Sequence, residues 1–105
     1  MADRPGLSYP SATILQALSV GYIYGYTVME ATGLPSGTVY PALRRLEADQ
    51  LIQSKWERQS TADAALRPPR RYYKLTRAGE AALEVSRKRY PLLAKLAPKE
   101  EVQDL

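Results

Sequence analysis

The amino-acid sequence predicts a mainly α-helical fold that carries one two-stranded antiparallel hairpin. Three patterns indicate this fold class: apolar residues recur at helical spacing in three short stretches, two runs of alternating polarity follow, and another helical repeat comes last. The chain of 105 residues is 45% hydrophobic and 25% charged, which is typical of one globular unit. We therefore expect the order helix, helix, helix, strand, strand, helix.

The first helix is predicted over residues 10–20. Ile14 and Leu18 lie on one stripe, because residues four apart share a face of a helix. Either Ser8 or Ser11 can cap the N-terminus, since a serine hydroxyl accepts a hydrogen bond from a free amide of the first turn. We expect the apolar stripe to pack into the core.

A short second helix is predicted over residues 26–31. It follows a turn at residues 21–25, and it ends at Gly33, which can adopt the left-handed conformation that closes many helices. A third helix begins almost immediately, over residues 38–49, with Ser36 as its expected N-cap. Two helices this close together are typical of a helix-turn-helix.

The hairpin is predicted from residues 51–58 and 70–75, which both alternate with the period of a half-buried strand. On the second strand, the alternation places Arg70 and Lys74 on the outward face. The eleven residues 59–69 between the strands are expected to form a loop that is longer than most hairpin connections.

The last helix is predicted to start after Thr76, whose hydroxyl can cap its first turn, and to be kinked or divided at Pro91. Residues 98–105 are expected to fray. Apolar residues fall on more than one side of this helix, so we expect a homodimer in which the first helix joins the interface. The predicted dimerisation residues are Ile14, Leu18, Leu83, Tyr90, Leu93 and Leu96.

The composition excludes several kinds of chemistry. The chain has no cysteine and no histidine, so we expect no disulfide, no zinc site and no imidazole catalysis. It shows no carboxylate pair, glycine-rich phosphate loop or nucleophile motif, and we expect no enzymatic activity and no cofactor. The pattern of a signal peptide is missing, and polar residues and glycines interrupt the apolar run 14–29. We therefore expect a cytoplasmic protein without a membrane span.

The charge distribution points to an anionic partner. The net charge is +4 and the isoelectric point is near 9.5. Residues 44–77 hold nine basic and four acidic residues, a net charge of +5, whereas the rest of the chain carries −1. This clustering around the third helix and the hairpin favours nucleic acid over mere solubility.

Three motifs in this order resemble the PadR family of winged helix-turn-helix transcriptional regulators. They are Tyr24-Gly25-Tyr26, residues 35–47 (PSGTVYPALRRLE) and residues 70–79 (RRYYKLTRAG), and the resemblance covers roughly residues 9–85. It implies a winged helix-turn-helix DNA-binding domain over residues 8–76, a C-terminal dimerisation helix over residues 77–98, a dimeric state and a repressor role. Three features depart from the family pattern: Gln50 in place of a glycine after the third helix, an alanine-rich stretch at residues 61–66 in the wing, and a short linker between Tyr26 and Ser36.

The third helix can be interpreted as a recognition helix from its geometry. Successive residues of a helix are rotated by about 100°, so Val39, Leu43 and Leu46 lie on one side of this helix. The other side carries small residues and Arg44, and its small bulk suits entry into the major groove of double-stranded DNA. Pro41 lies about one turn inside the helix, where we expect a smaller cost than in its middle. The predicted DNA-binding residues are Ser36, Gly37, Thr38, Tyr40, Pro41, Arg44, Arg45, Lys55, Arg67, Arg70, Arg71 and Lys74.

The aromatic residues allow a second kind of site. The chain has eight tyrosines but no phenylalanine, and packing can explain most of them. The resemblance implies a small aromatic effector as a further partner, because some family members bind such molecules. The candidate effector pocket consists of Tyr9, Tyr22, Tyr24, Tyr26 and Trp56.

The favoured function is a sequence-specific repressor that binds a two-fold operator as a homodimer. The alternative is a winged-helix protein-interaction module without DNA binding, because a fold does not dictate a function. Such a module would lack the excess positive charge on the hairpin and the third helix. A basic membrane-surface protein would instead carry its cations on one amphipathic helix.

Overall fold

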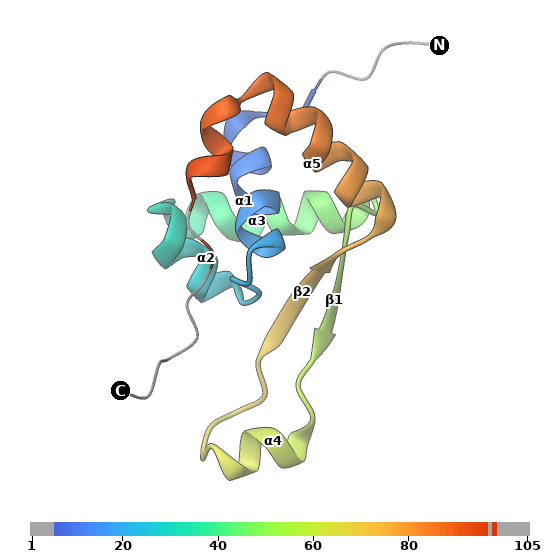
Figure 1. Ribbon diagram of the computed structural model, residues 1–105. Helices are drawn as coiled ribbons and strands as arrows, with labels where there is room; N and C mark the ends of the chain where they lie inside the picture. Colours follow the sequence, from blue (N-terminus) through green and yellow to red (C-terminus); the bar gives the residue numbers. More distant parts are fainter. Residues whose placement is uncertain (1–5, 97, 99–105) are drawn as a thin grey trace.

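The computed structural model describes residues 6–96 and residue 98, and it confirms the predicted fold class. A helical body carries a long hairpin that projects to one side (Figure 1). Residue 97 and most of the C-terminal tail for which we predicted fraying, residues 99–105, lie outside the described residues. The elements are α1 (Tyr9–Ser19), α2 (Gly25–Thr32), α3 (Ser36–Ala48), β1 (Ile52–Trp56), α4 (Gln59–Ala64), β2 (Arg71–Leu75), α5 (Arg77–Arg89) and the 3₁₀ helix η1 (Pro91–Lys95).

Helix α1 lies at the centre of the helical body, where it contacts α2, α3, α5, η1 and β2. Its N-cap is Ser8, whose Oγ accepts a hydrogen bond from the Ser11 amide at 3.3 Å. Ile14 and Leu15 are fully buried, together with Val28 of α2 and Leu43 of α3. The predicted stripe of the first helix therefore forms the core of the molecule. Among the described residues, no helix is long and apolar enough to cross a bilayer.

Helices α2 and α3 form the predicted helix-turn-helix. As expected, α2 ends at Gly33, which has a φ of 75°. Ser36 is not the N-cap of α3: Pro35 holds that place in an extended conformation, and its carbonyl accepts hydrogen bonds from the Thr38 and Val39 amides. The helix starts two residues earlier than the predicted residue 38, and the proline carbonyl, rather than a side chain, satisfies these amides.

Helix α3 passes through Pro41 without a break. A proline at this place removes one hydrogen bond, to the carbonyl of Gly37, and Gly37 is exposed so that water can reach that carbonyl. After the helix, Gln50 adopts a left-handed conformation with a φ of 62°. The glutamine thus supplies the turn for which a glycine would be the usual residue.

Strands β1 and β2 pair in antiparallel register, and their two faces differ in character. On one face Ser54 pairs with Tyr73, and Trp56 pairs with Arg71. On the other face, Gln53 pairs with Lys74 and Lys55 with Tyr72. The Tyr73 amide also donates to the Ile23 carbonyl at 2.9 Å, so the segment before α2 borders β2 and ties the hairpin to the helix-turn-helix.

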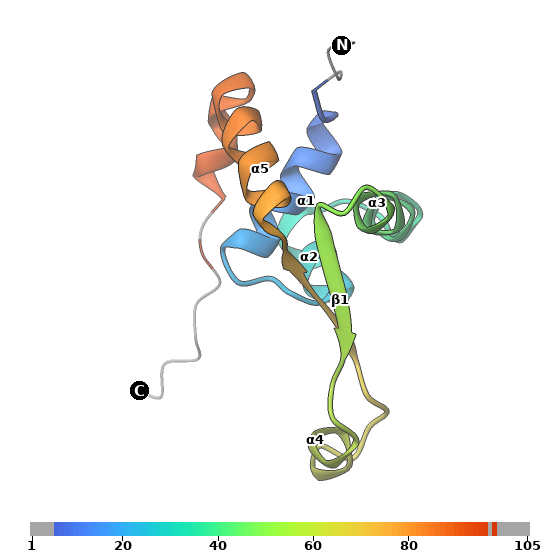
Figure 2. The same cartoon turned by 90° about the vertical axis from the view of Figure 1, so that its right-hand side faces the viewer.

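The connection between the strands is not the loop that we predicted. Residues Gln59–Ala64 form the short helix α4 at the far end of the hairpin (Figures 1 and 2). Alanine has the highest helix propensity, and Ala62 is fully buried within the tip. The alanine-rich stretch therefore builds a folded tip. The hairpin and this tip, residues 52–75, are called the wing below.

Helix α5 begins as predicted, because Thr76 Oγ1 accepts a hydrogen bond from the Gly79 amide at 3.0 Å. The same hydroxyl donates to the Gln50 carbonyl at 2.7 Å. At Pro91 the chain leaves α5 and enters η1, which lies against α1. The segment 77–96 consequently shares one core with the preceding elements.

This packing corrects the predicted dimerisation residues. Ile14, Leu18, Leu83 and Leu93 are all buried inside the single chain, and Tyr90 and Leu96 are half-buried against the same core. Helical spacing identified the apolar residues correctly, but η1 folds back and covers them. The exposed apolar side chains of this region are Val85 and Leu92, at 63% and 66% exposure.

Candidate nucleic-acid interface

The exposed side of α3 carries most of the predicted recognition residues. Ser36, Gly37, Tyr40, Arg44 and Arg45 are exposed, while Thr38 and Pro41 are half-buried. The opposite side is buried through Val39, Ala42, Leu43 and Leu46. Burial of this stripe fixes the rotation of the helix about its axis, so the exposed side is set by the core.

The wing presents exposed cations on both of its faces. Lys55 and Lys74 lie with Gln53 and Tyr72 on one face. Arg70, which we expected beside Lys74, lies one residue before β2, and its guanidinium is 5.5 Å from the centre of the Tyr24 ring. Arg70 therefore points to the start of α2 and not to the lysine face.

Glu57 holds the base of the wing tip together, and sequence analysis did not single it out. Its carboxylate accepts two hydrogen bonds from the Arg67 guanidinium, at 2.6 and 3.1 Å, one from the Arg70 amide at 3.0 Å and one from the Tyr24 hydroxyl at 3.1 Å. The Glu57 side chain is only 9% exposed. These donors, Arg67 first among them, lower the pKa of the Glu57 carboxyl to about 2.

A second carboxylate joins the wing to α3. Glu47 Oε1 lies 3.2 Å from an Arg71 nitrogen, and Glu47 Oε2 accepts a hydrogen bond from Ser54 Oγ at 2.7 Å. Arg71 Nε donates to the same Ser54 oxygen at 2.9 Å. Two of the predicted DNA-binding residues, Arg67 and Arg71, are thus engaged by carboxylates, while Arg70 and the two lysines show no such pair among the described residues.

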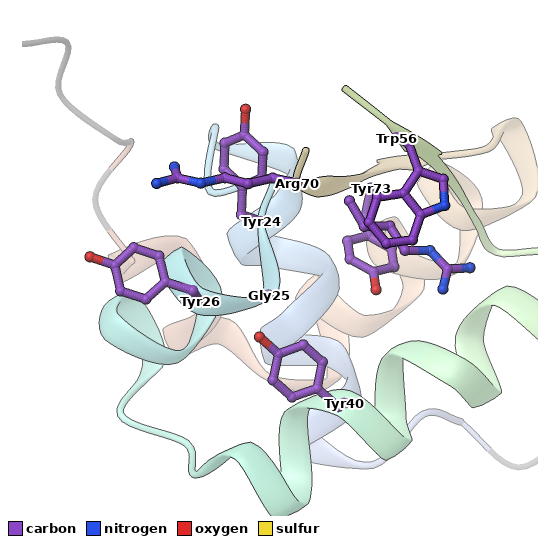
Figure 3. Close-up of a pocket in the computed structure, with 8 residues that line it drawn as sticks. Tyr24, Gly25, Tyr26, Tyr40, Trp56, Arg70 and Tyr73 are labelled. Atoms are coloured by element: carbon purple, nitrogen blue, oxygen red, sulfur yellow. The ribbon is translucent and has the colours of Figure 1, made fainter. Parts of the chain in front are cut away.

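A cavity of about 540 Å³ opens between the start of α2, the middle of α3 and one face of the hairpin (Figure 3). It contains three of the predicted effector residues, Tyr24, Tyr26 and Trp56. Its lining is aromatic with two cations and is made up of Tyr24, Gly25, Tyr26, Tyr40, Trp56, Arg70, Arg71 and Tyr73.

Two predicted effector residues lie elsewhere. Tyr9 makes an edge-on contact with Tyr90, with ring centres 5.1 Å apart, and Tyr22 packs against the core. Sequence analysis missed Tyr73, which the hairpin register places on the same face as Trp56. Burial raises the pKa of Tyr24 and of Tyr73, so both hydroxyls stay protonated and can donate at neutral pH.

The described part of the chain holds no group of three or more acidic side chains that could bind a metal ion. The chemistry of the interface therefore consists of cations, hydroxyl groups and aromatic faces. These groups suit an anionic and partly aromatic partner.

Comparison with known proteins agrees with this arrangement. The model of the transcriptional regulator PadR-like family matches residues 14–85. A PadR family transcription regulator from Clostridium difficile R20291 is 28% identical over 84% of this chain and 93% of its own, with a TM-score of 0.69. A PadR-like transcription factor from Bacteroides fragilis is also 28% identical, over 81% of this chain and 82% of its own, with a TM-score of 0.63.

One further similarity concerns the fold alone. The PcaV transcriptional regulator from Streptomyces coelicolor, solved in complex with its natural ligand, is 24% identical over 87% of this chain and 64% of its own, with a TM-score of 0.64. No protein of curated function matches the sequence.

Proposed function

The chain belongs to the PadR-like family of transcriptional regulators, which bind DNA and are not enzymes, and we propose that it is a sequence-specific repressor. One observation carries the proposal: Tyr40 on the exposed side of α3 and two wing cations, Arg70 and Arg71, border the same cavity, so one DNA duplex can meet both elements. Tyr40 lines the cavity from α3, and Arg70 and Arg71 line it from the wing.

Within this interface the two parts have different roles. Arg44, exposed on α3, is a candidate for hydrogen bonds to a base edge in the major groove. Arg70, Lys55 and Lys74 are candidates for phosphate contacts, which position a protein on DNA without reading its sequence. Arg67 and Arg71 act mainly by holding the wing in shape through Glu57 and Glu47.

Selection of bound duplexes from a random DNA pool tests the DNA-binding function. We expect enrichment of a two-fold sequence whose half-sites lie about 10 base pairs apart, one helical turn. Failure to enrich any sequence, together with undetectable binding to duplex DNA, would favour the alternative, a protein-interaction module. Transcription from a promoter that carries the enriched site, with and without the protein, then separates repression from activation.

The homodimer also belongs to the proposal. Val85 of α5 and Leu92 of η1 are large apolar side chains that the single chain leaves exposed, and a second copy would cover them. Leu92→Glu should yield a folded monomer, which sedimentation would detect. Its affinity for the operator, measured by titration with DNA, should be weaker. Leu93→Glu is unsuitable, because Leu93 is buried and the charge would destabilise the fold. A wild-type protein that is already monomeric at micromolar concentration would contradict the dimer.

The cavity is the proposed effector site. Its aromatic walls and the guanidinium groups of Arg70 and Arg71 suit a planar aromatic anion. Such a ligand would share Tyr40 and Arg70 with DNA, so the two would exclude each other. Trp56 lines the cavity and is the only tryptophan, so its fluorescence can report titrations with hydroxybenzoates, with neutral benzyl alcohol as the control. A fluorescence change without displacement of DNA would contradict the shared site.

A further inference from the structure

Leu66, at the tip of the wing, combines two unfavourable features. Its side chain is 92% exposed, the highest value among the large hydrophobic residues that the structure describes as exposed. Its backbone has a φ of 60°, in the left-handed region that suits glycine or asparagine and that costs a leucine strain. Folding of the chain by itself gains nothing from a leucine here, so the side chain points to a partner.

The surrounding contacts hold Leu66 in place. The Leu66 amide donates to the Asp63 carbonyl at 3.0 Å, and the following Arg67 amide donates to the Ala62 carbonyl at 3.1 Å. Ala62 is fully buried, and the Arg67 guanidinium is fixed by its two hydrogen bonds to Glu57. The tip therefore presents the leucine from a folded unit.

The chemistry around Leu66 favours DNA as the partner. The exposed charged residues between the tip and the body include Arg58, Arg70 and Lys55, which would attract a polyanion. The tip also carries Asp63, whose carboxylate accepts a hydrogen bond from Gln59 Nε2 at 2.8 Å. An exposed apolar residue at the tip of a wing that carries these cations suits the minor groove, where phosphates form the rims and sugars and base edges form the interior.

The position of the tip fits the neighbouring groove. Figure 2 looks along α3 and shows the hairpin leading away from it, with α4 at the far end. Five strand residues at about 3.3 Å each span roughly 13 Å between the first and the last, and the tip lies beyond them. The centre of the adjacent minor groove lies roughly half a helical turn, about 17 Å, from the major groove.

We propose that Leu66 is an apolar wedge that enters the minor groove beside the major groove contacted by α3. This inference rests on the proposed DNA binding. Insertion of an apolar side chain partly unstacks a base step, so the wedge would favour a flexible pyrimidine–purine step at that place in the operator. The wing tip would then contribute to sequence preference without a hydrogen bond to any base.

Leu66→Gly tests the wedge without threatening the fold, because glycine relieves the strain at this φ. We expect an unchanged or higher melting temperature and about tenfold weaker operator binding. The slope of log affinity against log salt concentration should not change, since no charge is lost. Leu66→Met, which keeps a long apolar side chain, should retain most of the affinity.

A 2-aminopurine base placed at successive steps of the operator reports unstacking directly. Wild-type protein should raise its fluorescence at one step in the minor groove next to the α3 site, and Leu66→Gly should abolish the rise. Wild-type affinity of the Leu66→Gly variant, or a rise that persists, would overturn the wedge. A Leu66→Gly variant that sediments differently from the wild-type protein would also overturn the wedge, because Leu66 would then belong to a contact between subunits. Absence of DNA binding by the wild-type protein would instead refute the proposed function.

Discussion

Helix α3 and the wing border the same cavity, but different forces hold them in place. Helix α3 is held by apolar burial, with Val39, Leu43 and Leu46 packed into the core. The wing buries Ile52, Ala62 and Tyr73, and its shape also depends on Glu57 and Glu47, whose carboxylates accept hydrogen bonds from both strands, the tip and the N-cap of α2.

Because of this difference, α3 and the wing should respond differently to changes in pH and salt concentration. Apolar burial does not depend on protonation and varies little with salt, so α3 should keep its position over a wide range of conditions. Charged hydrogen bonds respond to pH, so the wing should loosen before the helical body does. The part that we propose to read bases is therefore rigidly placed, while the part that we propose to contact phosphates is adjustable.

The largest expected effect is loss of the buried stripe of α3. Leu43→Ala should lower the free energy of unfolding by about 2–5 kcal/mol, because it removes buried methyl groups and leaves a cavity. Urea denaturation measures the change. Arg45→Ala, an exposed change on the same helix, should stay within about 0.5 kcal/mol of wild type. Equal effects of the two substitutions would show that α3 is not held by burial.

The next effect concerns base recognition by α3. Arg44→Ala should cost about 1–3 kcal/mol of binding free energy on the selected operator and should remove discrimination at one base pair. Binding to scrambled DNA should weaken much less. Titrations on both duplexes decide the matter, and an equal loss on both would assign Arg44 to phosphate.

A smaller effect is expected from the wing. Arg70→Ala should weaken binding to all sequences nearly alike, and in a dimer it should make the slope of log affinity against log salt shallower by about 1.8, at 0.9 per phosphate. Lys95→Ala removes a charge from exposed η1 and is the matched control, for which we expect an unchanged slope. A changed base preference for Arg70→Ala would move Arg70 from the phosphate contacts to base recognition.

The smallest effect is the pH response of the wing. The pKa of Glu57 is lowered from 4.5 to about 2 in the folded protein, so its network contributes fully above about pH 4.5 and is lost as the pH falls toward 2. The protection factors of the β1 and β2 amides, which correct for the intrinsic slowing of exchange in acid, should fall over this range before those of α1 do. Glu57→Gln removes the titrating group, so its hairpin should show a weaker pH dependence. An identical dependence in both proteins would mean that Glu57 does not control the wing.

The same contrast explains how far the sequence predicts the structure. The stripe through Leu43, the left-handed Gly33, the Thr76 cap and the break at Pro91 are local signals, and all four were predicted correctly. Two failures are local, the Ser36 cap of α3 and the loop predicted where α4 forms, whereas the failure at the dimerisation residues is non-local. Leu93 seemed free for a partner because spacing along a helix does not reveal that η1 folds back onto α1.

The candidate site was predicted in the same uneven way. The exposed residues of α3 followed from helical period, and the three family motifs fall at the start of α2, on α3, and on β2 with the start of α5. Glu57 was missed because its partners, Tyr24 and Arg67, lie 33 and 10 residues away in the chain. No periodicity carries that information, and only the folded hairpin brings the three side chains together.

The junction at Thr76 has a mechanical consequence. The Thr76 amide donates to the Leu51 carbonyl at 3.0 Å, its hydroxyl holds the Gln50 carbonyl, and a β-carbon at Gly79 would overlap the Leu51 oxygen. The first turn of α5 is thus clamped to the residues that directly follow α3. A tilt of α5 cannot be absorbed at this joint, so the two helices behave as the arms of one lever. Any force that turns α5 is therefore delivered to the C-terminal end of α3, which lies at the same joint.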